Sequence, residues 1–125
     1  MAPDQCTILI IEDDFGIRDA MTQILEDEGY AVIGVEHGLA ALEVLRSLPQ
    51  RPQLIMLDLT LPRLSGREFL RTYRSDPLLE HIPVIIMSAD STALHLEEFP
   101  GAIDVLPKPI ELMTLLDVVG QYCSI

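Results

Sequence analysis

The protein has 125 residues, and its content of 49% hydrophobic and 5% aromatic residues is typical of one domain with an aliphatic core. Its 20 acidic and 8 basic residues give a formal charge of −12. We therefore expect no direct binding to nucleic acid or to an anionic membrane surface, since both are bound through clustered lysine and arginine side chains. No run approaches the roughly 18 apolar residues of a membrane span, and the first residues lack the basic start and apolar run of a signal peptide. These features predict a cytoplasmic protein.

The two cysteines, Cys6 and Cys123, lie near opposite ends of the chain. In an aliphatic domain, such residues are more often small buried hydrophobic side chains than a disulfide. Their spacing to each other and to histidine does not match a zinc site. We expect two buried, unpaired cysteines, with a disulfide as the less favoured alternative.

The first half of the chain alternates between strand and helix patterns. The β-branched, apolar run Thr7–Ile11 predicts a buried strand. Apolar residues at helical spacing then predict a helix that Asp14 caps and Gly29 closes. Tyr30–Val35 predicts a second strand, and the spacing of leucine and alanine over residues 41–48 predicts a second helix, which Pro49 ends.

The middle of the chain contains the most informative strand. Leu54–Asp58 shows no apolar–polar alternation, so both faces of this strand need apolar cover, as in the centre of a parallel sheet. Ser65 and Glu68 form a capping-box pair that predicts the start of the next helix. Pro83–Met87 then predicts a fourth buried strand.

The last third repeats the alternation in a weaker form. Residues 91–98 predict only a short helix, because Phe99–Pro100–Gly101 breaks it. Ala102–Leu106 predicts a weak fifth strand, and residues 112–119 carry the apolar stripe of a last helix. Alternating strands and helices predict a doubly wound α/β domain with a parallel sheet and helices on both faces.

Chemically useful side chains follow four of the predicted strands. They are Glu12, Asp13, Asp58, Ser88 and Lys108. Because parallel strands end at one edge of a sheet, we expect these groups to lie close together. Three adjacent carboxylates repel one another unless a cation intervenes, and an all-oxygen ligand set suits Mg²⁺. A carboxylate nucleophile, a divalent cation, a lysine and a hydroxyl group together predict a phosphoryl-transfer site.

Four motifs at these strand ends carry a family resemblance. The segments I-I-E-D-D, L-I-M-L-D-L-T-L-P-R-L-S-G, V-I-I-M-S-A and L-P-K-P occur in this order. They resemble the CheY-like receiver domain of two-component response regulators, over about Thr7 to Tyr122. The resemblance implies a flavodoxin-like fold with five strands in the order 2-1-3-4-5. It also implies a single receiver domain over residues 1–125, with a core of about 7–122. The stretch between Ser88 and Lys108 departs from the family pattern, and this departure predicts a shortened or distorted fourth helix at 91–98.

The resemblance also implies a role for each matching residue. Asp58 resembles the phosphoacceptor, which takes its phosphoryl group from a histidine kinase or a phosphotransfer protein. Asp13 and Asp58 resemble direct ligands of Mg²⁺ (or Mn²⁺), Glu12 a ligand through water, and Thr60 a ligand through its backbone carbonyl.

Ser88 and Lys108 resemble the two residues that contact the phosphoryl oxygens, and Lys108–Pro109 a cis peptide bond. Such a domain is a phosphoryl acceptor with at most autodephosphorylation activity and is otherwise no enzyme. It switches the contacts of a downstream protein partner or output domain.

A further departure from the family pattern concerns a single residue and leaves alternatives open. Receivers usually carry Tyr or Phe three residues before the lysine, where this chain has Val105, a branched side chain with few rotamers. The readout of phosphorylation is therefore expected to be altered, and a degenerate receiver that docks partners without phosphorylation is an alternative. A phosphatase with an aspartyl nucleophile is disfavoured, because Thr60 stands where its second aspartate belongs.

Overall fold

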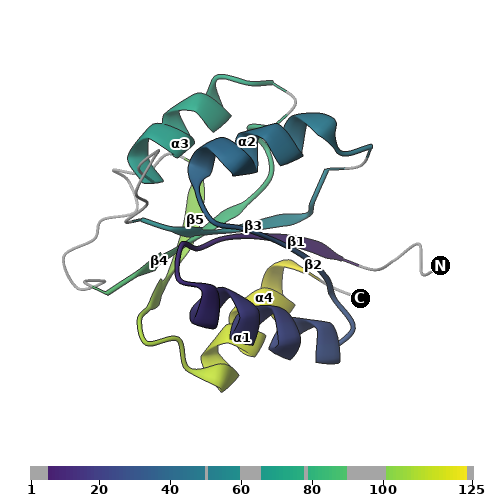
Figure 1. The fold of residues 1–125 in the computed structure, drawn as a ribbon, viewed down its shortest axis with the longest axis vertical. Coiled ribbons are helices and arrows are strands. Elements are labelled where there is room, and N and C mark those ends of the chain that lie inside the picture. The colour runs from purple at the N-terminus through teal and green to yellow at the C-terminus, as the bar shows by residue number, and fades with distance from the viewer. Residues whose placement is uncertain (1–5, 50, 60–65, 78, 90–100, 124–125) are drawn as a thin grey trace.

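The computed structural model of the protein describes residues 6–49, 51–59, 66–77, 79–89 and 101–123 (Figure 1). Its described strands form one sheet: β1 (Thr7–Ile11), β2 (Ala31–Val35), β3 (Leu54–Asp58), β4 (Val84–Ser88) and β5 (Ala102–Pro107). All neighbours are parallel, in the order β2-β1-β3-β4-β5. This order confirms the predicted fold class.

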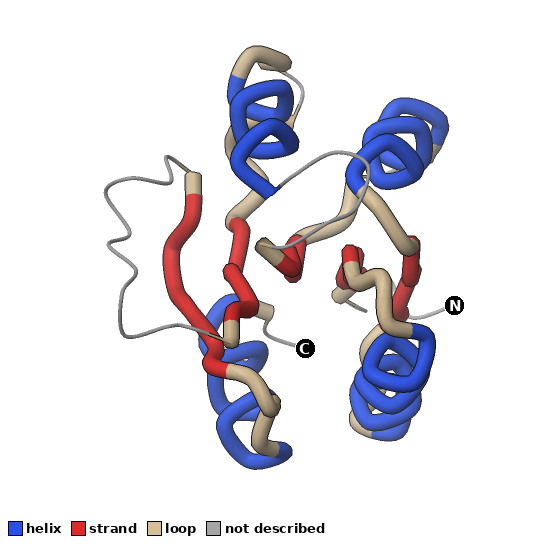
Figure 2. The backbone as a smooth tube through the Cα atoms, turned by 60° about the vertical axis from the view of Figure 1, so that its left-hand side comes forward, coloured by secondary structure: helices blue, strands red, loops and turns tan. Residues whose placement is uncertain are grey.

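Four helices are described, and they cover both faces of the sheet. They are α1 (Phe15–Asp27), α2 (Gly38–Ser47), α3 (Gly66–Arg74) and α4 (Leu112–Tyr122). Figures 1 and 2 show α2 and α3 on one face and α1 and α4 on the other. Within the described ranges, no helix has the length and apolar character needed to cross a membrane. The short helix expected at 91–98 and the capping residue Ser65 lie outside the described residues.

The central strands are buried on both faces, as the lack of alternation in β3 predicts. Every residue of β3 is buried. Ile55 and Leu57 contribute to the apolar cluster under α2 and α3, whereas Leu54 and Met56 contribute to the cluster under α1 and α4. Successive side chains of a strand point to opposite faces, so a continuous apolar run fills two cores at once. β3 therefore holds Asp58, its last residue, on a rigid support.

Several predicted element ends are confirmed and others shift slightly. Asp14 caps α1 by accepting a hydrogen bond from the Ile17 N–H at 2.9 Å. β2 begins one residue later than predicted, because the Tyr30 N–H donates to the Leu25 carbonyl at the end of α1. β4 extends to Ser88, which pairs with Pro107 of β5.

The two cysteines correct one expectation. Cys6 lies just before β1 and Cys123 just after α4, and both are buried, as predicted. They form a disulfide across 117 positions of sequence, with their Cα atoms 5.8 Å apart. The expectation that they stay unpaired is therefore wrong. The fold brings the start of β1 and the end of α4 to the same side of the molecule (Figure 1), and linear spacing does not reveal that proximity.

Candidate functional site

The predicted functional residues gather where the parallel strands end. Glu12 and Asp13 follow β1, Asp58 ends β3, Ser88 ends β4, and Lys108 follows β5. Strand register aligns these ends, since Ile11 pairs with Leu57, Asp58 with Met87, and Ser88 with Pro107. The structure therefore brings together side chains that are up to 96 positions apart in the sequence. Thr60 lies outside the described residues.

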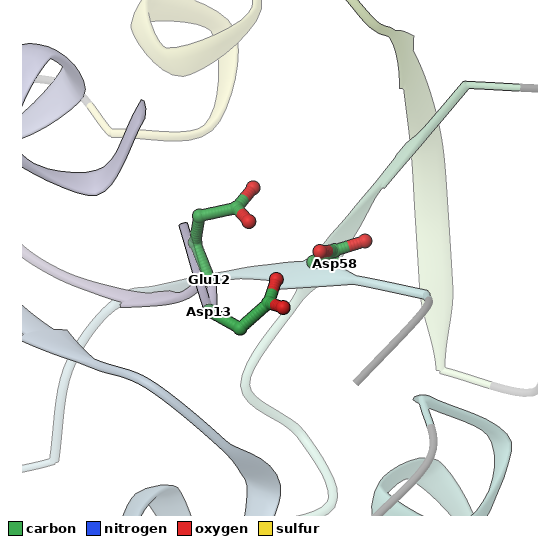
Figure 3. A group of neighbouring side chains, drawn as sticks. All are labelled: Glu12, Asp13 and Asp58. Atoms are coloured by element: carbon green, nitrogen blue, oxygen red, sulfur yellow. The ribbon is translucent and has the colours of Figure 1, made fainter. Parts of the chain in front are cut away.

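Three carboxylates form an acidic cluster at this edge. Glu12, Asp13 and Asp58 each offer an oxygen, and these oxygens all lie within 4.8 Å of one another. Figure 3 shows Glu12 and Asp13 at the end of β1, with their side chains leaving the strand end in different directions and Asp58 beside both of them. Glu12 and Asp58 are only 0% and 4% exposed, whereas Asp13 is exposed. An oxygen-only set that is partly open to solvent fits Mg²⁺, which keeps several of its own waters.

Lys108 lies between two of the acids. Its Nζ is 2.7 Å from Glu12 Oε1 and 3.2 Å from Asp58 Oδ2. The backbone of this lysine is fixed as well, because its N–H donates to the Ser88 carbonyl at 2.8 Å. The expected cis bond between Lys108 and Pro109 is confirmed. The lysine thus supplies a positive charge to the acidic cluster from an anchored position.

Burial and charge shift the proton affinities of this cluster. Burial raises the pKa of the Glu12 carboxyl above its ordinary value of 4.5, the charge of Asp58 adds to the rise, and the contacts with Lys108 and the Asp14 N–H only partly offset it. Burial alone would lower the pKa of Lys108, but its bond to Glu12 and the charges of the two acids outweigh burial and raise that pKa above 10.5. The lysine therefore stays protonated at neutral pH.

Replacing Lys108 by Met is expected to lower the free energy of unfolding of the metal-free protein by about 2 kcal/mol at pH 7. The reason is that Glu12, fully buried, and Asp58 lose a cation that contacts both. The expected loss is smaller than for a fully buried ion pair because the lysine side chain is 18% exposed, so solvent screens part of the interaction. Urea unfolding followed by circular dichroism measures the loss. Arg46→Met removes an equal charge from the exposed surface of α2 and is the control.

The loss on replacing Lys108 is expected to depend on pH. A carboxyl group whose folded pKa is raised favours folding when protonated, so the contribution of Glu12 is fully present below pH 4.5 and is lost as pH rises through its folded pKa. Removing the lysine raises that pKa further. The stability deficit of Lys108→Met should therefore be largest at neutral pH and shrink toward pH 4.5. An equal deficit at both pH values would contradict the assigned ion pairs.

Sequence reasoning missed one side chain near this site. Arg18 of α1 reaches back to the acidic cluster, and its Nη1 donates to the Glu12 backbone carbonyl at 2.7 Å. The available signal was Gly34 inside β2, because a glycine within a strand often marks a close approach by another group. The arginine side chain occupies the space beside that glycine.

Comparison with known proteins agrees with this arrangement. The family model described as response regulator receiver domain matches residues 8–120. Sporulation initiation phosphotransferase F of Bacillus subtilis (strain 168) is 33% identical over 117 residues, which cover 92% of this chain and 91% of that protein. The response regulator MprA of Mycobacterium ulcerans (strain Agy99) is 36% identical over 111 residues, which cover 87% of this chain. That match spans only 46% of MprA, so this chain corresponds to about half of it.

Solved structures with the same fold extend the comparison. The chemotaxis protein CheY4 of Vibrio cholerae superposes with a TM-score of 0.86 at 25% identity, covering 94% of this chain and 98% of that one. The receiver domain of a sensor histidine kinase from Pseudomonas aeruginosa PAO1 has a TM-score of 0.83 at 25% identity, over 97% and 99% of the two chains. That neighbour has a magnesium ion coordinated in its active-site cleft. The family match over residues 8–120 and the shared fold show that this chain belongs to the response regulator receiver domains of two-component systems.

Proposed function

We propose that the protein is a phosphorylatable receiver in which Asp58 accepts a phosphoryl group from a histidine kinase or a phosphotransfer protein. One observation carries the proposal. Asp58 is 4% exposed at the end of a central strand. Its carboxylate lies within 4.8 Å of oxygens from Glu12 and Asp13 and is 3.2 Å from Lys108 Nζ. This arrangement provides a carboxylate nucleophile, ligands for a cation, and a positive charge for phosphoryl oxygens. Residues 1–125 form a single receiver unit in this proposal, with a core of about 7–122.

The proposed reaction transfers one phosphoryl group between two side chains. A carboxylate oxygen of Asp58 forms a bond to phosphorus as the phosphorus–nitrogen bond of the donor phosphohistidine breaks, and the leaving imidazole keeps the electron pair. When bound, Mg²⁺ or Mn²⁺ neutralises charge on the phosphoryl oxygens. Asp13 and Asp58 would hold the ion directly, Glu12 through water, and Thr60 through its backbone carbonyl.

Two further residues are proposed to stabilise the transferred group. Lys108, anchored through its backbone N–H, presents its ammonium group to one phosphoryl oxygen. Ser88, whose strand end adjoins that of Asp58, presents its hydroxyl group to another. The phosphoryl group adds about 1.5 to 2 negative charges to the sheet edge, and this change is proposed to switch contacts with a downstream protein partner or an output domain. In this proposal the protein acts as a phosphoryl acceptor in the cytoplasm, with at most autodephosphorylation activity.

Incubating the protein with acetyl phosphate tests this proposal. Intact-mass spectrometry should detect one added phosphoryl group in the presence of Mg²⁺ and none in the presence of EDTA, because three carboxylates alone repel an incoming anion. A phosphorylated histidine phosphotransfer domain should transfer the same group with the same metal dependence. A protein that stays unmodified with both donors and Mg²⁺ would overturn the proposal.

A degenerate receiver is the second candidate function, and Val105 is the observation that favours it. This residue stands where receivers usually carry an aromatic ring, and it packs against the apolar cluster under α2 and α3. A branched aliphatic side chain has no ring to swing between two positions. A protein that takes no phosphoryl group but still binds partners would support this candidate. NMR shifts that stay local to the site on phosphorylation would instead mean that acceptance is retained and the readout is altered.

A further inference from the structure

The backbone at the end of β1 is held by an unusual donor. The Glu12 N–H donates to the Val35 carbonyl at 3.0 Å, which continues the ladder between β1 and β2. In a regular parallel ladder, the Glu12 carbonyl would then accept a hydrogen bond from the N–H of His37, which lies two positions after Val35. β2 ends at Val35, and His37 instead caps α2. The guanidinium group of Arg18 takes the place of that missing donor, at 2.7 Å.

Gly34 gives the arginine side chain its path to this carbonyl. A Cβ atom at Gly34 would lie 3.1 Å from both Cγ and Cδ of Arg18. The three nearest atoms to such a Cβ all belong to that one side chain. The stem of the arginine thus lies directly over the strand, and even an alanine at position 34 would require this stem to shift by a few tenths of an ångström. The Phe15 ring flanks the guanidinium group, with the ring centroid 5.6 Å from Arg18 Cζ.

The contact with Arg18 completes the fixation of Glu12. Its N–H is bound to Val35, its Oε2 accepts from the Asp14 N–H at 3.1 Å, and its Oε1 lies 2.7 Å from Lys108 Nζ. The remaining polar atom is the backbone carbonyl, which the arginine holds. The peptide unit that starts with this carbonyl ends at the nitrogen of Asp13. Its orientation therefore sets where the Asp13 carboxylate stands relative to Asp58.

We propose that Arg18 is a positioning residue of the acidic site, and that Gly34 is required because it leaves room for the arginine stem. The arginine binds neither a metal nor a phosphoryl group in this proposal. It fixes the peptide between Glu12 and Asp13, so that their carboxylates face Asp58. The inference deepens the proposed function, and its metal-binding test rests on that function.

Mg²⁺ affinity tests the proposal, because a positioning role and a purely electrostatic role for Arg18 predict changes in opposite directions. Removing a positive charge near a cation site strengthens cation binding by electrostatics alone. Arg18→Met keeps much of the apolar stem and removes the donors, and we expect it to weaken Mg²⁺ binding by roughly fivefold, measured by calorimetric titration with the metal. Gly34→Ala changes no charge and should weaken binding in the same direction by a smaller factor, because its Cβ only shifts the arginine stem. Gly120→Ala, on an open face of α4 where a Cβ meets nothing within 4 Å, should leave binding unchanged.

A double-mutant cycle tests whether the two residues act together. In a protein that already carries Arg18→Ala, the further change Gly34→Ala should have no effect on Mg²⁺ binding, because the atoms that its Cβ would displace are absent. Additive losses would show that Gly34 acts through another contact and would overturn its assigned role. Unchanged or tighter binding in Arg18→Met would overturn the role of the arginine.

Hydrogen exchange in the metal-free protein decides the inference independently of Mg²⁺. The Asp14 N–H donates to Glu12 Oε2, so loss of the arginine contact should speed exchange of this amide by roughly fivefold in Arg18→Met. Unchanged exchange would overturn the proposal. If the wild-type protein binds no Mg²⁺, the proposed function loses its cofactor, while the exchange rates still decide whether Arg18 positions the site.

Discussion

Asp58→Asn protein is expected to gain no phosphoryl group from acetyl phosphate and Mg²⁺ under conditions that label the wild-type protein. The amide has nearly the shape of the carboxylate, so the strand end that carries it should keep its structure. Its oxygen lacks the negative charge and nucleophilicity that attack on phosphorus requires. The change also removes one of the three carboxylates that lie within 4.8 Å of one another, so Mg²⁺ binding should weaken as well. Intact-mass spectrometry measures the labelling.

Loss of labelling in Asp58→Asn must be separated from loss of structure. The variant should unfold in urea close to the wild-type concentration, because loss of the ion pair with Lys108 is offset by relief of the repulsion between Asp58 and the buried carboxylate of Glu12. Asp117→Asn, on the exposed side of α4, is the matched control and should label fully. A phosphoryl group that persists on Asp58→Asn would place the acceptor elsewhere, with Asp13 the first position to examine.

Much of the fold follows from patterns within single segments. The absence of alternation in Leu54–Asp58 predicted a strand covered on both faces, and all five of its residues are buried. A parallel sheet follows from this, because helices on both faces require crossover connections. The order 2-1-3-4-5 required the family resemblance, since spacing alone does not say which strands are neighbours.

The candidate site was predictable to the extent that it depends on strand ends. Parallel strands end at one edge, so Glu12, Asp58 and Lys108 had to approach one another, and the two ion-pair distances bear this out. The Arg18 contact was not predictable in the same way. It depends on how α1 lies against β2 and on where β2 stops, and both are set by packing rather than by local sequence.

Reducing the disulfide between Cys6 and Cys123 is expected to lower the free energy of unfolding by about 5 kcal/mol in the chain-entropy model, because the bond closes a loop across 117 positions. A loss of that size is a large fraction of the roughly 5–15 kcal/mol that stabilises a typical domain. Urea unfolding with and without a thiol reductant measures it. The free energy of unfolding should also fall more steeply with urea concentration after reduction, because the unfolded chain becomes less compact and exposes more surface.

The position of the disulfide predicts that its reduction lowers stability without changing phosphorylation of the folded protein. Cys6 precedes β1 and Glu12 follows it. The disulfide and the acidic cluster therefore lie at opposite ends of this strand, roughly 20 Å apart at 3.3 Å per residue. Reduced protein that remains folded should therefore label with acetyl phosphate as the oxidised protein does. A variant with both cysteines replaced by alanine is the control, because a reductant should not change its stability. If the reductant destabilises this variant and the wild-type protein equally, the effect does not come from the disulfide, and the assigned bond contributes nothing to stability.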